Sequence, residues 1–188
     1  ILNPKFKFPY GGYMVSILNP RSKILISQLF LFLFSLFVST FVLAADADIT
    51  RQTIKGLRAV HVIVEGIQPN IQKYAQKAGV SKEQVKKDVE SQLLRDGFKI
   101  LDENEWLRTP GKPVLYVNIN THETEKYWYA YNIELKLKQV VSLEANPSIK
   151  TLASTWSLNI TGMANIGSLG NMKNSVRELV DRFIKACK

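Results

Sequence analysis

The pattern of hydrophobic and polar positions predicts a strand, two helices and a second strand in the middle of the chain. Residues 57–66 (LRAVHVIVEG) are rich in β-branched side chains and end at a glycine, which is typical of a strand. Residues 69–78 begin with proline and residues 81–96 with serine, and both segments then repeat apolar side chains three or four positions apart. We therefore expect two helices, followed by a short strand over residues 98–101.

In the C-terminal half, hydrophobic and polar residues first alternate, and the last segment then has apolar side chains at helical spacing. Hydrophobic residues alternate with polar ones over residues 114–121, 128–143 and 155–164, which predicts three strands. Residues 171–186 carry apolar side chains at the i, i+3, i+4, i+7 and i+8 positions of an amphipathic helix. Loops or turns are expected at residues 102–113, at residues 122–126 and around Asn146 and Pro147.

These elements predict a single α+β domain over residues 57–187, with the element order β-α-β-β-β-β-α. A mostly antiparallel sheet of about five strands, with helices packed on one face, buries both kinds of apolar stripe. A domain of this length buries about two-thirds of its unfolded surface without disulfides or metals. Residues 45–56 (ADADITRQTIKG) are polar and lack sustained periodicity, so we expect a flexible tether there.

The N-terminal region has the pattern of a secretory signal. An apolar run over residues 29–38 (LFLFLFSLFV) follows two basic residues and precedes two alanines. Residues 14–44 are therefore expected to be a signal peptide that is cleaved after Ala44, which makes the protein periplasmic or secreted. The alternative is an uncleaved anchor over residues 24–45, nearly long enough to span a bilayer. Residues 1–13 are expected to be upstream sequence joined by an incorrect start site.

Composition excludes several kinds of site. The chain has 188 residues, one cysteine (Cys187) and two histidines, which excludes a disulfide framework, a multi-cysteine zinc site and a histidine-rich metal centre. The formal charge is +9, but residues 1–44 hold four basic and no acidic residues, so the exported part is less basic. Nucleic-acid binding is disfavoured, and no cofactor is expected. Cys187 could join two chains or remain a free thiol, and both alternatives stay open.

Two polar groups contain a histidine. His122, Glu123 and Glu125 lie in an expected turn and are competent ligands for a divalent cation, although a solvated turn is the favoured interpretation. His61 and Glu65 share one face of the first strand and form a candidate general-base pair, but a lone strand histidine is more often structural. We therefore assign no catalytic residue and do not expect an enzyme.

The densest aromatic group is YWYAY at residues 127–131, with Tyr116 on the preceding strand. Trp128 points away from the apolar face, and beside Tyr116 it could stack on a sugar ring or anchor a protein partner. Cross-strand packing on a partly covered sheet face is the alternative. The candidate binding residues are Trp128, Tyr116 and Tyr127.

Four stretches of the chain carry a resemblance. They are VHVIVEG, VKKDVESQLLRDGFKIL, LYVNINTHETEKYWYAYNIELKLKQVV and VRELVDRFIKA. Together they resemble a group of exported bacterial α+β proteins. This resemblance implies no activity, and it therefore assigns no site residues. The element order is also similar to small envelope modules such as the N-terminal domain of the periplasmic Tol translocation protein. That similarity concerns the fold alone and implies a bacterial envelope location with a role in assembly or scaffolding.

Three functional hypotheses follow from the sequence. The leading one is a non-catalytic exported module that binds an envelope protein through its sheet face or an edge strand. The second is a binder of small ligands or glycans that uses Trp128. The third is a hydrolase built on His61 and Glu65.

Overall fold

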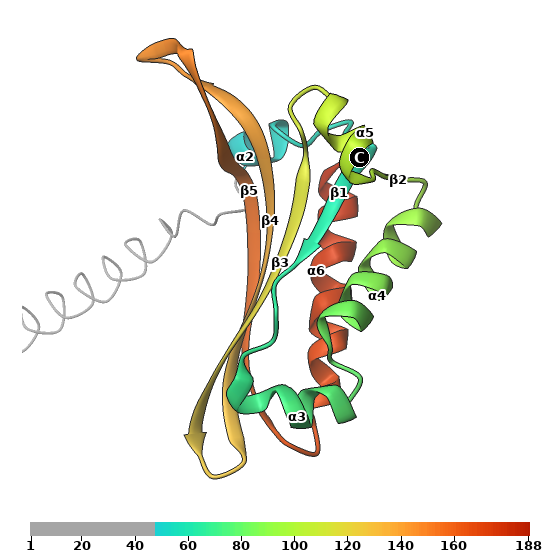
Figure 1. The fold of residues 1–188 in the computed structure, drawn as a ribbon, viewed down its shortest axis with the longest axis vertical. Helices are drawn as coiled ribbons and strands as arrows, with labels where there is room; N and C mark the ends of the chain where they lie inside the picture. Colours follow the sequence, from blue (N-terminus) through green and yellow to red (C-terminus); the bar gives the residue numbers. More distant parts are fainter. Residues whose placement is uncertain (1–47) are drawn as a thin grey trace, which may run out of the picture. The chain divides into compact units, whose positions relative to one another are not determined.

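The computed structural model describes residues 48–188, in which a twisted sheet is covered by helices (Figure 1). The expected signal peptide, cleavage site and upstream segment fall on residues 1–47, outside the described residues. The helices are α2 (Asp48–Gln52), α3 (Pro69–Lys77), α4 (Lys82–Arg95), α5 (Glu103–Arg108), the 3₁₀ turn η1 (Leu169–Asn171) and α6 (Met172–Ala186). The strands are β1 (Ala59–Val64), β2 (Lys99–Ile100), β3 (Val114–Glu125), β4 (Trp128–Leu143) and β5 (Asn146–Asn165).

The α+β class and the five-stranded sheet are confirmed, but the prediction of a mostly antiparallel sheet is wrong. The strand order is β2-β1-β3-β4-β5, and β1 runs parallel to both of its neighbours. The β3–β4 and β4–β5 pairs are antiparallel, so the sheet is mixed. The physical reason is the crossover: α3 and α4 return the chain to the starting end of β1, so β2 enters the sheet in the same direction.

Two helices were not predicted, so the element order differs from the expected one. Helix α5 occupies the expected loop at residues 102–113, where Asp102 and Glu105 form a capping box. Helix α2 lies in the segment expected to be a tether, and Ile54 just after it is fully buried in the core. Part of that segment is therefore folded in the structure, because the apolar side chain of Ile54 is buried in the core. In the sequence, Ile54 stands among polar residues, so its position shows no hydrophobic periodicity.

The predicted helical stripes form the core. Val85, Val89 and Leu93 of α4 are buried, and Ser81 caps this helix by accepting a hydrogen bond from the Gln84 amide. The predicted stripe of α6 is also buried; its members are Val176, Leu179, Val180, Phe183 and Ile184. Asn171 lies at the N-cap position of α6, but its side chain makes no capping bond.

Helices α3, α4 and α6 lie against one face of the sheet, here called the inner face (Figure 1). The alternation over residues 155–164 predicts that Trp156, Leu158 and Ile160 point inward; Trp156 and Leu158 of β5 are buried in this core, and Ile160 packs against it. The opposite, outer face carries the polar positions of β3 and β4, and α5 covers it at β1. There the Trp106 ring of α5 stacks on His61, with ring centroids 5.6 Å apart.

Gly162 of β5 makes room for the Tyr131 ring on β4. A Cβ atom at position 162 would lie 2.5 Å from the Tyr131 hydroxyl oxygen and 2.6 Å from Cζ. We expect Gly162→Ala to force the half-buried Tyr131 ring aside and to lower the free energy of unfolding by about 1–3 kcal/mol. Urea unfolding of the variant measures this. In a Tyr131→Ala background the same glycine substitution should cost little, and an equally large cost there would contradict the explanation.

Candidate functional site

The free edge of β5 is the most unusual surface of the described structure. β5 is the last strand of the sheet, and no strand of residues 48–188 pairs with its far side. Its fifteen residues from Thr151 to Asn165 include neither a charged residue nor a proline. Natural edge strands are usually protected from unwanted pairing by lysines, prolines or bulges, so an uncharged edge of this length is a ready template for another strand.

Hydrogen bonds at the end of β5 identify which backbone groups face this edge. Asn165 lies opposite Trp128, yet its N–H donates to the Ser168 hydroxyl at 3.0 Å. The next residue, Ile166, donates to the Tyr127 carbonyl of the neighbouring chain segment at 3.1 Å. Because residues of an antiparallel ladder alternate in direction, the backbone groups that face outward are those of the odd-numbered residues. In the open stretch these residues are Ser157, Asn159, Thr161 and Met163.

One part of this edge is covered. The Thr53 hydroxyl donates to the Thr155 carbonyl oxygen at 3.1 Å, and the Gln139 amide donates to both the Thr53 carbonyl and the Thr155 hydroxyl. Thr155 is the extra residue of a bulge, because Trp156 pairs with Leu137 while Ser154 pairs with Lys138. We define the open edge as the backbone and outward side chains of residues 157–163.

Beyond the bulge, β4 and β5 continue as a two-stranded arm past the end of the helices, seen as the orange hairpin at the top of Figure 1. Leu143, Ile149 and Leu152 on this arm have exposed fractions of 42%, 47% and 48%. Exposed apolar side chains on an extended arm are typical of a contact surface. The arm adjoins the covered end of the β5 edge.

A shallow hollow lies on the outer face near the β3–β4 turn, with a volume of about 220 Å³. Its lining residues are Asn120, Thr121, His122, Ala130, Tyr131, Asn132 and Thr161. Trp128 lies on the same face two residues before Ala130 and is 43% exposed, while Met163 lies opposite Ala130 and is 61% exposed. The small side chain of Ala130 thus lies between two large exposed side chains.

The three predicted binding residues do not form one site. Tyr116 lies opposite Lys136, eight residues along β4 from Trp128, which is about 26 Å at about 3.3 Å a residue. Tyr127 has a positive φ of 68° in the turn, and its ring packs edge-on against Tyr74 of α3 at 6.4 Å. Of the three residues, Trp128 lies nearest the hollow along the chain, two residues before the lining residue Ala130. Its expected partnership with Tyr116 is wrong, because the register places the two far apart.

The candidate metal ligands are separated by strand alternation. The expected turn at residues 122–126 is strand as far as Glu125. His122 points to the outer face and Glu123, opposite Tyr129, to the inner face, and a bulge at Thr124 then returns Glu125 to the outer face opposite Trp128. Glu123 accepts a hydrogen bond from the Tyr127 amide at 3.2 Å. No group of three or more histidine, cysteine or acidic side chains in residues 48–188 is placed to hold a metal ion.

His61 and Glu65 do not form a general-base pair. The Nδ1 atom of His61 lies 2.8 Å from the Leu101 carbonyl oxygen, and its ring stacks on Trp106. Glu65 instead accepts a short hydrogen bond from the Tyr116 hydroxyl. Both side chains therefore have structural partners, which removes the geometric basis of the hydrolase hypothesis.

The Tyr116–Glu65 bond predicts a change of stability at high pH. The hydrogen bond to Glu65, with burial and the carboxylate charge, raises the pKa of Tyr116 to about 12. The unfolded chain loses this proton near the ordinary pKa of about 10, so the bond contributes below pH 10 and its contribution is lost as the pH rises toward 12. We expect the urea midpoint to fall more steeply between about pH 10 and 12 in the wild type than in Tyr116→Phe. Equal slopes would contradict this assignment.

Cys187 is a core residue. Its side chain is fully buried, its amide donates to the Phe183 carbonyl, and its carbonyl accepts from Gly56. Burial raises the pKa of the thiol to about 12, which suppresses the reactive thiolate at neutral pH. A disulfide between two chains would require this thiol to leave the core, so the structure gives the cross-link no support.

Sequence reasoning proposed an edge strand as one possible binding surface, but it did not identify which strand forms the edge, and it missed Met163. The relevant signal was present in the sequence, because the absence of charge between Thr151 and Asn165 can be read directly. What could not be read was that this strand ends the sheet, since strand order depends on pairing between distant segments.

Comparisons with known proteins leave the function open. No protein-family model matches the chain, and no curated protein matches its sequence. Within residues 48–188, no helix has the length and hydrophobicity needed to cross a membrane.

Proposed function

We propose that the protein is a non-catalytic exported module that binds an envelope protein partner through the open edge of β5. The observation that carries this proposal is the uncharged edge with outward backbone groups at Ser157, Asn159, Thr161 and Met163. An extended segment of the partner adds to the sheet as a sixth strand. Its main-chain hydrogen bonds provide affinity, and its alternate side chains provide specificity.

The surroundings of the edge support a protein partner. The side chains of Thr161 and Met163 lie on the outer face beside the hollow, so a strand paired with β5 would place its own alternate side chains on that face. The exposed leucines and isoleucine of the arm extend the apolar contact in the other direction. A role in assembly or scaffolding at the cell envelope agrees with the expected export signal, and it requires no cofactor.

In-cell photo-crosslinking tests the proposal. A photo-crosslinking amino acid at position 163 is expected to capture one or two envelope proteins in near-stoichiometric amounts, identified by mass spectrometry. The matched control places the same amino acid at position 178, an exposed site on α6. Equal capture at both positions, or no specific capture at position 163, would overturn the proposal. The mature N-terminus, read from the same preparation, checks the cleavage after Ala44.

The hollow beside Trp128 favours a second candidate function, the binding of a glycan or another small ligand. The 43% exposed Trp128 ring offers a stacking surface, and the amides of Asn120 and Asn132 line the hollow next to it. Titration with cell-wall fragments should change tryptophan fluorescence in the wild type. The change should be absent in Trp128→Ala, which retains Trp106 and Trp156. An unchanged signal across the wild-type titrations would count against this candidate.

A further inference from the structure

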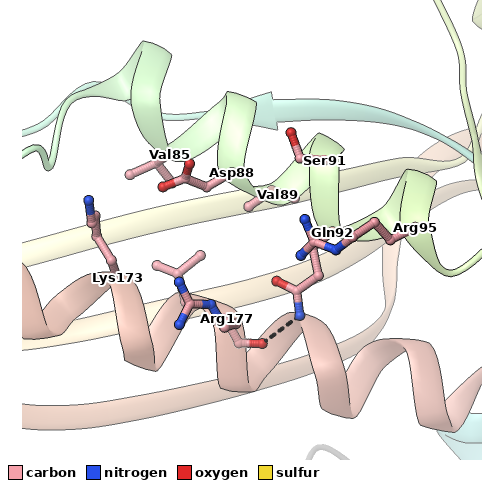
Figure 2. Close-up of a pocket in the computed structure, with 9 residues that line it drawn as sticks. Val85, Asp88, Val89, Ser91, Gln92, Arg95, Lys173 and Arg177 are labelled. Atoms are coloured by element: carbon pink, nitrogen blue, oxygen red, sulfur yellow. Dashed lines mark hydrogen bonds between the residues drawn. The ribbon is translucent and has the colours of Figure 1, made fainter.

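A groove between α4 and α6 lies on the helical layer, away from the sheet surfaces discussed above. Figure 2 shows side chains of α4 facing side chains of α6 across this groove, whose volume is about 110 Å³. The lining residues are Val85, Asp88, Val89, Ser91, Gln92, Arg95, Lys173, Val176 and Arg177. Three of them are basic and one is acidic, so the lining has an excess of positive charge.

The floor of the groove is held in place by Gln92. Its side chain is only 6% exposed, and its amide nitrogen donates to the Arg177 carbonyl at 3.0 Å and to Asp181 at 2.6 Å. The dashed line in Figure 2 marks the first of these bonds. Because this bond uses the backbone of Arg177, the arginine side chain has no part in joining the helices.

The cations of the groove lack acidic partners among the described residues. No carboxylate of residues 48–188 forms an ion pair with Arg95, Lys173 or Arg177. The two acidic groups beside the groove are occupied otherwise: Asp88 accepts from the Gln84 amide at 2.7 Å, and Asp181 accepts from Gln92. Three cations against the single carboxylate of the lining, Asp88, leave an excess of positive charge around the hollow, which favours an anion.

We propose that this groove binds a phosphate group. Two guanidinium groups, from Arg95 on one helix and Arg177 on the other, can each donate paired hydrogen bonds to phosphate oxygens. Lys173 adds a third positive charge. Val85, Val89 and Val176 leave an apolar wall beside the charged groups, which suits a phosphate attached to an apolar body.

The phosphate can come from a membrane lipid headgroup or from a soluble phosphate compound. The site does not depend on the proposed partner at the β5 edge, because its residues lie on α4 and α6. Binding at the groove and binding at the edge can therefore be tested and can fail separately.

Nuclear magnetic resonance titration of the purified protein with inorganic phosphate tests the site. We expect saturable shifts of the Arg95 and Arg177 side-chain resonances. Arg177→Gln and Arg95→Gln should each weaken phosphate binding about tenfold or more, because each removes a charge-assisted donor pair. Asp88→Asn should strengthen binding by removing the acidic group of the lining. The matched control is Lys87→Gln, which removes an exposed cation from α4 that does not line the groove.

Vesicle flotation separates the two sources of phosphate. Binding to phosphatidylglycerol vesicles that Arg177→Gln abolishes would support the groove and assign the phosphate to a lipid. Saturable phosphate binding without vesicle binding would support the groove and assign a soluble ligand. No saturable binding up to about 10 mM phosphate, or equal weakening by Lys87→Gln, would overturn the proposal. Thermal unfolding of each variant verifies folding, and the two arginine variants provide independent tests.

Discussion

Phe183→Ala is expected to lower the free energy of unfolding by about 3–5 kcal/mol, a large part of the about 5–15 kcal/mol of a typical domain. The Phe183 ring is fully buried on α6, with its centroid 5.3 Å from that of Trp156 on β5 and 5.8 Å from that of Phe98. It thus joins α6 to β5 of the sheet and to Phe98, the residue that precedes β2. Removing the ring leaves a cavity that rigid neighbours fill only partly, so the loss exceeds the transfer free energy of the ring alone.

Urea unfolding followed by circular dichroism measures this loss. Leu94→Ala is the matched control, because Leu94 is 57% exposed on α4 and its removal leaves no cavity. We expect the control to change stability by less than about 0.5 kcal/mol. A loss below about 1 kcal/mol for Phe183→Ala would mean that the packing of α6 on β5 contributes little to the fold.

The amphipathic helices were predictable because their signal is local. In α6 the spacing of Val176, Val180 and Phe183 alone predicts which side is buried, and the same holds for the valines of α4. Whether neighbouring strands run parallel or antiparallel is not a local property, since it depends on the end of the sheet to which the connection returns the chain. The dipeptide strand β2 has too few residues to show a pattern, and its parallel pairing with β1 follows from α3 and α4 lying between them.

The candidate site was predictable only in part, for a related reason. Alternation predicted that Trp128 points away from the core, and in the structure it is exposed on the outer face, two residues from Ala130 in the lining of the hollow. The distance between Tyr116 and Trp128 was not predictable, because it depends on the register of β3 against β4. This register places Tyr116 opposite Lys136. The same register extends β3 to Glu125 and places His122 and Glu123 on opposite faces of the sheet.

Asn159→Pro is expected to reduce capture of the partner at least tenfold while preserving the fold. The N–H of Asn159 faces the open edge and is not needed for pairing with β4, so proline removes a donor from the binding edge alone. Proline is compatible with an edge strand at such a position, and the preceding residue is already extended. A partner strand would lose one main-chain hydrogen bond and would meet the proline ring at the line of contact.

Asn159→Ala is the matched control, because it removes the same side chain but keeps the backbone donor. Capture of the partner by a tagged protein, quantified from the native host, should be near the wild-type level for alanine and strongly reduced for proline. Ile160→Pro provides the opposite comparison: its N–H faces β4, so that variant should lose stability as well as binding. Equal capture by the proline and alanine variants of Asn159, with both folded, would show that the partner does not pair with this edge and would leave the hollow beside Trp128 as the stronger candidate.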